Sequence, residues 1–139
     1  MTDIAVIGGG PAGLTAALYA ARAGKSVTVY ERECIGGQIT RAPLVENYPG
    51  TGTVSDLQLG DSMAAQAEAA GAVISLTDVQ KIVKETSGFF RLDTDDGEYC
   101  AKAVYICLRC AAENARITRG SRACRSRHQL LCTVRWQLF

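Results

Sequence analysis

A glycine-rich run near the N-terminus has the spacing of a dinucleotide-binding motif. The run Gly8-Gly9-Gly10-Pro11-Ala12-Gly13 fits GxGxxG and lies between a segment that predicts a strand and one that predicts a helix. In this motif Gly8 permits a tight turn, Gly10 lets the backbone approach a pyrophosphate, and Gly13 lets helix and strand pack closely. The phosphates would lie at the helix N-terminus, where unpaired N–H groups and the helix dipole favour negative charge.

An acidic residue at the end of the next predicted strand completes the pattern. Glu31 lies eighteen residues beyond Gly13, and a carboxylate there can accept hydrogen bonds from ribose hydroxyls. The same carboxylate would repel a 2′-phosphate, so FAD or NAD is preferred to NADP at this site. The alternative is a glycine-rich turn that binds nothing, which the shared register of strand, helix and carboxylate disfavours. The motif alone does not separate FAD from NAD.

Cysteines offer a second kind of chemistry, for which the sequence gives less support. Cys34 has no partner in its motif, and we interpret it as a plain thiol. The pair Cys107 and Cys110 matches CxxC, but it lacks a second ligand pair and the usual position of a redox pair at a helix start. We therefore expect neither a redox disulfide nor a metal site here.

Composition limits the remaining possibilities. The chain has 139 residues, 47% of them hydrophobic and 21% charged, which is typical of one globular domain. A formal net charge of +1 gives no long-range attraction for nucleic acid or an anionic membrane, so a small-molecule partner is favoured. The apolar stretch 4–21 lacks a preceding basic region and is interrupted by glycines and Pro11, so it does not predict a signal peptide. We expect a cytoplasmic protein.

The elements that must position the motif can be read from the spacing of apolar residues and breakers. A strand, a helix and a second strand form a βαβ unit, and a breaker-rich loop over 32–54 is expected to serve a ligand. A second helix, a third strand and a β-meander follow. We predict an α/β, Rossmann-like FAD/NAD(P)-binding fold with an irregular C-terminal tail. The predicted strands are 3–7, 26–30, 72–76, 79–85, 89–94 and about 98–102, and the predicted helices are 11–23 and 55 or 56 to about 70.

Three segments, in order, resemble the FAD domain of bacterial-type thioredoxin reductases. They are residues 8–21 (GGGPAGLTAALYAA), 36–40 (GGQIT) and 45–50 (VENYPG). The resemblance implies that Gly37, Gln38 and Thr40 line the flavin and that Asn47 contacts it nearby. It also implies that Asp78 and Val79 lie near the adenine. Glutathione- and lipoamide-reductase relatives place their redox cysteines just after the corresponding Gly-Gly, where this chain has Gln38-Ile39-Thr40.

The resemblance implies an activity that this chain carries only in part. In the intact family enzyme, electrons pass from NADPH to FAD, then to a CxxC disulfide and then to thioredoxin, and the enzyme is a homodimer. The chain resembles the family over about residues 1–105, which we predict to be the FAD-binding domain fragment. It has no second GxGxxG for NADPH, no Cys-Ala-x-Cys and no returning C-terminal FAD segment. We therefore assign no catalytic residue to it and expect the chain alone to be inactive.

The last third of the chain differs from the family in a way that suggests a shifted reading frame. Codons can be chosen for residues 107–120 that give ASGAQPKTLGLPGE when read one nucleotide later, and residues 125–138 allow GRGISYCALCDGNF. Both follow the family's order, so we hypothesise a frameshift near Tyr105 or Ile106 and expect a poorly ordered tail over 106–139. A lineage-specific tail is the alternative. The shift would also explain the residues that could suggest a zinc site, Cys124, His128 and Cys132.

Two functional classes remain open. The first is a thioredoxin-disulfide reductase or close relative whose gene is interrupted. The second is a non-catalytic FAD-binding fragment, or a module completed by another chain. Related flavoproteins, namely ferredoxin–NADP reductases of this fold and the alkyl hydroperoxide reductase flavoprotein, share the N-terminal signature. The CALC of the shifted frame favours a dithiol enzyme over the ferredoxin-linked type.

Overall fold

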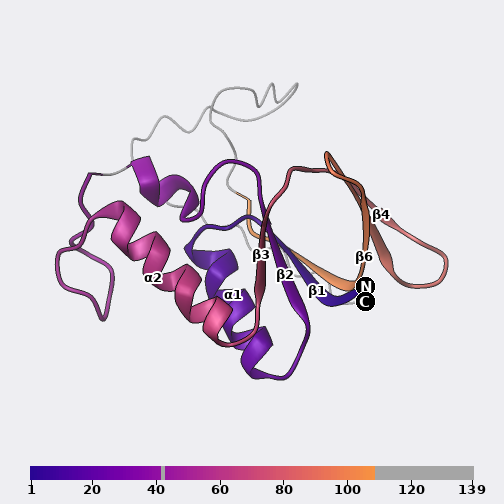
Figure 1. Cartoon of the computed structure of the whole chain (residues 1–139), viewed down its shortest axis with the longest axis horizontal. Coiled ribbons are helices and arrows are strands. Elements are labelled where there is room, and N and C mark those ends of the chain that lie inside the picture. The colour runs from indigo at the N-terminus through magenta and orange to yellow at the C-terminus, as the bar shows by residue number, and fades with distance from the viewer. Residues whose placement is uncertain (42, 109–139) are drawn as a thin grey trace, which may run out of the picture.

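The computed structural model of the chain describes residues 1–41 and 43–108, which form one six-stranded sheet with two α-helices (Figure 1). The strand order is β3-β2-β1-β6-β5-β4. The elements are β1 (Thr2–Ile7), α1 (Pro11–Arg22), β2 (Val27–Glu31), a 3₁₀ helix η1 (Gly37–Arg41), α2 (Asp56–Ala69), β3 (Val73–Leu76), β4 (Val79–Lys84), β5 (Phe90–Thr94) and β6 (Glu98–Ile106). The predicted α/β, Rossmann-like fold is confirmed, and each predicted strand and helix is present within a few residues.

Strand β6 joins the two halves of the sheet, and it is longer than predicted. Its first half pairs antiparallel with β5, from Asp93 opposite Glu98 to Phe90 opposite Ala101. Its second half pairs parallel with β1, ending with Ile7 opposite Ile106. The prediction stopped this strand at about residue 102. Residues 103–106 continue it because the neighbouring β1 supplies the backbone partners that an isolated apolar run lacks.

The second half of β1, at the centre of the sheet, is buried on both faces. On one face α1 and α2 pack against a core made largely of alanine and valine: Val6, Ala17, Ala21, Val27, Val29, Ala67 and Ala72. On the other face, residues of β1, β2, β5 and β6 form a second core: Ala5, Ile7, Tyr30, Leu92 and Ala101. Successive residues of β1 thus point into different cores, which explains its uninterrupted apolar sequence.

Both helix starts follow from the sequence. Gly10 is the N-cap of α1 and Pro11 occupies the first turn, where its missing N–H costs nothing. The N-cap of α2 is Ser55, whose hydroxyl accepts a hydrogen bond from the Gln58 N–H at 3.2 Å. The Gln58 side chain in turn accepts from the Ser55 N–H at 3.2 Å, which completes a capping box. Of the two predicted caps, Ser55 is therefore the cap, and Asp56 begins the helix.

The loop over residues 32–54 contains more regular structure than its breakers predict. Residues Gly37–Arg41 form η1, and Val45 and Val54 form an isolated antiparallel bridge with N–H···O distances of 2.9 and 3.1 Å. Three glycines in this loop have positive φ, Gly36 at 97°, Gly37 at 57° and Gly50 at 88°. The bridge closes the second half of the loop on itself and brings the chain to the start of α2.

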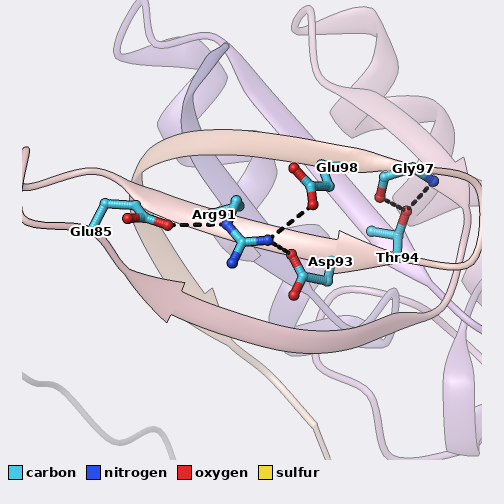
Figure 2. Close-up of polar contacts among 6 residues, drawn as sticks. All are labelled: Glu85, Arg91, Asp93, Thr94, Gly97 and Glu98. Carbon is cyan, nitrogen blue, oxygen red and sulfur yellow. Dashed lines mark hydrogen bonds and ion pairs between the residues drawn. The ribbon is translucent and has the colours of Figure 1, made fainter.

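Charged side chains hold the outer face of the meander together (Figure 2). Arg91 lies among three carboxylates: it is 3.0 Å from Glu85, 3.0 Å from Glu98 and in contact with Asp93. At the β5–β6 turn the Thr94 hydroxyl accepts a hydrogen bond from the Gly97 N–H at 3.1 Å. The Arg91–Glu98 pair links β5 to β6, and the Arg91–Glu85 pair links β5 to the residue that follows β4. Across the part of the chain that the structure describes, no helix is long and apolar enough to cross a membrane.

Candidate functional site

The glycine-rich turn joins β1 to α1 by close backbone packing. Gly8 has a φ of 107°, which favours glycine, and its N–H donates to the Tyr30 carbonyl at 2.8 Å. A Cβ on Gly13 would lie 1.9 Å from the Gly8 carbonyl oxygen, and one on Gly8 would lie 2.7 Å from the Cys107 carbonyl oxygen. The turn is therefore held between the start of α1 and the end of β6, as the roles assigned to Gly8 and Gly13 require.

Glu31 lies against this turn, and its carboxylate is already held by two backbone amides. One oxygen, Oε2, accepts from the Gly9 N–H at 2.7 Å, and the other, Oε1, accepts from the Glu33 N–H at 2.9 Å. A carboxylate offers about four lone-pair sites, so both oxygens keep acceptor capacity. The carboxylate is thereby fixed in orientation and can still accept hydrogen bonds from a diol.

The N-terminus of α1 provides the complementary donors. No side chain caps it, since the N-cap is Gly10, and its first turn holds no acidic residue. The N–H groups of this first turn, which includes Ala12, have no partner within the helix. Together with the helix dipole they favour an anion, and Gly10 leaves room for its approach, because the nearest atom to a Cβ there would be 3.8 Å away. Amide donors beside a fixed carboxylate match the diphosphate and ribose of an ADP group.

The loop after β2 packs directly on the glycine-rich turn. The Gly36 N–H donates to the Gly9 carbonyl at 2.9 Å, and a Cβ on Gly37 would lie 3.3 Å from the Gly10 Cα. Thr40 donates its hydroxyl to the Gly37 carbonyl at 2.7 Å. The structure thus brings Gly37 and Thr40, both predicted site residues, next to the motif.

Gly60 of α2 is a packing residue that the sequence reasoning missed. A Cβ at Gly60 would lie 3.2 Å from the Gly36 Cα, so α2 presses directly against the loop. The available signal was a glycine inside a predicted helix. Glycine there is about 1 kcal/mol less favourable than alanine, so its presence indicates that another segment packs closely against that position.

Gln38 and Asn47 lie further along the same loop. Both side chains are exposed, Gln38 on η1 and Asn47 in the segment that the bridge of Val45 and Val54 closes. Their roles toward a flavin thus stay predictions from the resemblance.

Asp78 lies between β3 and β4, close to the end of β2, and Val79 is the first residue of β4. The Thr77 N–H donates to the Glu31 carbonyl at 2.9 Å, which places Asp78 next to the carboxyl end of β2. The backbone of Asp78 is held by the meander, because its N–H donates to the Asp95 carboxylate at 3.1 Å and its carbonyl accepts from the Asp95 N–H at 3.2 Å. Val79 packs against the second core. Asp95, which braces this corner, was not identified from the sequence.

Charges at this edge of the site are mostly negative. Arg32 pairs with Glu33 at 2.8 Å, and both side chains are exposed. The hydrogen bond that Arg32 donates to the Glu33 carboxylate raises the pKa of the Arg32 guanidinium, and the charges of Glu33 and Asp78 raise it further. Among the described side chains, three carboxylates, Glu31, Glu33 and Asp78, and the Arg32 guanidinium therefore lie near the end of β2.

Cys34 and Cys100 are free thiols. Cys34 is exposed, with its Sγ 3.3 Å from the Thr40 hydroxyl. The Cys107 N–H donates to the Ile7 carbonyl at 2.8 Å, which continues the pairing of β6 with β1. Within residues 1–41 and 43–108 no group of three or more His, Cys, Asp or Glu side chains is placed to hold a metal ion. The other candidates lie outside the described residues: Cys110, Cys124, His128 and Cys132.

Comparison with known proteins identifies the family of this chain. A model of the family described as pyridine nucleotide-disulphide oxidoreductase matches residues 2–117. Thioredoxin reductase of Helicobacter pylori is 42% identical over 108 residues, which are 76% of this chain and 35% of the relative. The 34.2 kDa protein in the rubredoxin operon of Clostridium pasteurianum is 41% identical over 105 residues, 75% of this chain and 34% of the relative.

Solved structures of thioredoxin reductases are also similar to this chain. Thioredoxin reductase from Streptococcus pyogenes superposes with a TM-score of 0.72 and 40% identity, over 76% of this chain and 34% of that one. The Lactococcus lactis enzyme gives a TM-score of 0.72 and 32% identity, over 81% of this chain and 38% of that one. The chain spans about a third of the length of the curated relatives it matches. The predicted resemblance to the N-terminal part of a thioredoxin reductase is confirmed, and the chain belongs to the pyridine nucleotide-disulphide oxidoreductase family.

Proposed function

We propose that this chain forms the part of a thioredoxin-disulfide reductase-type flavoenzyme that binds the ADP half of FAD. The observation that carries the proposal is the Glu31 carboxylate, held by the Gly9 and Glu33 amides beside the uncapped N-terminus of α1. This arrangement offers acceptors for ribose hydroxyls and donors for a diphosphate in one place. The family and the thioredoxin reductase relatives support FAD as the ligand.

Each part of the site has its own task in this proposal. Glu31 orients the ribose, and the turn with the first amides of α1 positions the diphosphate. The loop residues Gly37, Gln38, Thr40 and Asn47 extend the site toward the flavin, and Asp78 with Val79 borders the adenine. When FAD is bound, its isoalloxazine ring supplies the redox chemistry. In the whole enzyme NADPH would be the electron donor and thioredoxin the acceptor, and two copies of the enzyme would form the dimer.

A second candidate function is FAD binding without electron transfer. Residues 1–139 contain one GxGxxG motif and no Cys-Ala-x-Cys pair. In this reading the chain is an FAD-binding fragment or a module completed by another chain. The genomic neighbourhood separates the two readings, because a neighbouring reading frame that encodes an NADPH-binding domain favours the enzyme.

Titration of FAD into the full chain tests the proposal, with flavin fluorescence as the readout. We expect saturable binding that Glu31→Ala weakens by at least tenfold, since this substitution removes the ribose acceptor and leaves the Gly9 N–H without its partner. Glu68→Ala, at an exposed position of α2, is the matched control and should bind as the unsubstituted chain does. Equal affinity of the Glu31 and Glu68 variants would exclude the proposed site.

We also propose that residues 106–139 are read out of frame. The support is the family-like sequence that a one-nucleotide shift permits over residues 107–120 and 125–138. Sequencing the gene across codons 100 to 145 tests this directly. Codons that cannot yield the shifted sequence would exclude the frameshift and leave a lineage-specific tail.

A further inference from the structure

Arg32 is the cation at the ribose edge of the proposed site, and its neighbour Glu33 holds it. Arg32 Nη2 lies 2.8 Å from Glu33 Oε1. The Glu33 backbone is itself fixed to the site, because its N–H donates to Glu31 Oε1 at 2.9 Å. The negative charge of Glu31 also raises the pKa of the Arg32 guanidinium, so a ligand bound at Glu31 lies within range of the charge of Arg32.

A ligand that carries a 2′-phosphate would meet opposing charges here. Arginine is the residue that accommodates a 2′-phosphate in dinucleotide-binding folds, through paired N–H donors. In this chain the guanidinium is engaged by Glu33 and lies near Asp78, while Glu31 occupies the position that faces the ribose. A phosphate would therefore have to displace Glu33 and approach three carboxylates.

We propose that Glu33 is a specificity-determining residue, which neutralises Arg32 and so makes the site reject 2′-phosphorylated adenosine ligands. The inference rests on the proposed function and adds a residue to it. Such rejection has a use: a flavoenzyme that also uses a 2′-phosphorylated nicotinamide cofactor must keep that cofactor out of its FAD site. Glu31 rejects it through direct contact, and Glu33 removes the cation that would otherwise attract it.

The test compares ADP with 2′-phospho-ADP by calorimetric titration of the full 139-residue chain. Glu33→Gln keeps the shape of the side chain and removes its charge. Because the Arg32 and Glu33 side chains are 66% and 53% exposed, water screens the pair, and we expect affinity for 2′-phospho-ADP relative to ADP to rise about fivefold. The rise should shrink in high salt, since the screening length is about 10 Å at 0.1 M and shorter above it.

Two further variants separate the effect of the Arg32–Glu33 ion pair from the effect of a change in net charge. Glu68→Gln makes the same change of charge near the end of α2, which precedes the start of β3, whereas Thr77 follows the end of β3. It should leave the ratio of affinities for 2′-phospho-ADP and ADP unchanged. The double variant Arg32→Gln with Glu33→Gln removes the freed cation and should return the ratio to that of the unsubstituted chain. Circular dichroism verifies that each variant is folded.

The outcomes distinguish this inference from the function on which it rests. Failure of the unsubstituted chain to bind ADP overturns the proposed function, and the inference with it. Binding of ADP together with an unchanged ratio in Glu33→Gln overturns the inference alone. An equal rise in Glu68→Gln also overturns it, because net charge would then be the cause.

Discussion

Replacing Gly13 by alanine tests the closest backbone packing in the proposed site. The added Cβ would lie 1.9 Å from the Gly8 carbonyl oxygen, where a real contact is well beyond 3 Å, so α1 must move away from β1. Overpacking lowers the free energy of unfolding by about 1–3 kcal/mol. Because the atom that the new Cβ meets is rigid backbone, we expect a loss of about 3 kcal/mol here. Alanine is better than glycine in a helix by about 1 kcal/mol, which leaves a net loss of about 2 kcal/mol. For a domain of this size that lowers Tm by about 8–16 °C.

Thermal unfolding followed by circular dichroism measures this effect, and Gly52→Ala is the matched control. Gly52 has ordinary φ and open space around its Cα, so alanine there should leave Tm within a few degrees of the unsubstituted chain. FAD titration of Gly13→Ala should also show weakened binding, because moving α1 displaces the diphosphate donors. Equal Tm values for the two variants would refute the argument that the turn is held by backbone contact.

Three other substitutions address single interactions. Glu31→Gln should lower the free energy of unfolding by about 1.5 kcal/mol in a denaturant titration and weaken ADP binding, because the two N–H donors bind different carboxylate oxygens and glutamine replaces one of these oxygens with an NH2 donor; unchanged ADP affinity would contradict the assigned role. The Lys102 ammonium, 2.7 Å away, holds the pKa of Asp3 far below its usual range. Because the folded-state pKa is depressed, the stability that Asp3 adds is present above its unfolded pKa of about 3.9 and is lost as pH falls below it. The difference in Tm between the unsubstituted chain and Asp3→Asn should accordingly be constant between pH 5 and 8 and shrink below about pH 4. A difference that does not change with pH would argue against the ion pair. Ser55→Ala should cost about 1 kcal/mol by removing the cap of α2, whereas Ser62→Ala, within the same helix, should cost nothing measurable by the same titration; equal losses would mean that the cap is not the cause.

Local signals in the sequence were enough to predict the helices, most of the strand boundaries and the glycine-rich motif. Breakers and caps located both helices within a residue or two, since Pro11, Ser55 and Gly71 act through backbone geometry that needs no distant partner. The βαβ unit and the position of Glu31 followed from spacing, because alternating strand and helix periods dictate a parallel pair with its loops at one edge.

The length and path of β6 could not be obtained in this way. Residues 103–106 form a strand because β1 lies beside them, and the chain offers no local mark of that partner. The close contact of Gly60 with Gly36, and the bracing of Asp78 by Asp95, likewise depend on segments that meet only after the sheet has formed.

The sequence by itself determined the class of fold, the glycine-rich turn and the acidic end of β2, since each rests on residue types at fixed short spacing. Only the tertiary structure decided how these parts become a site. It placed both Glu31 oxygens on backbone amides, set the Gly36–Gly37 loop on the turn and paired Arg32 with Glu33. The physical reason is that hydrogen bonds and ion pairs depend on distances of a few ångströms between segments, and spacing along the chain does not specify them.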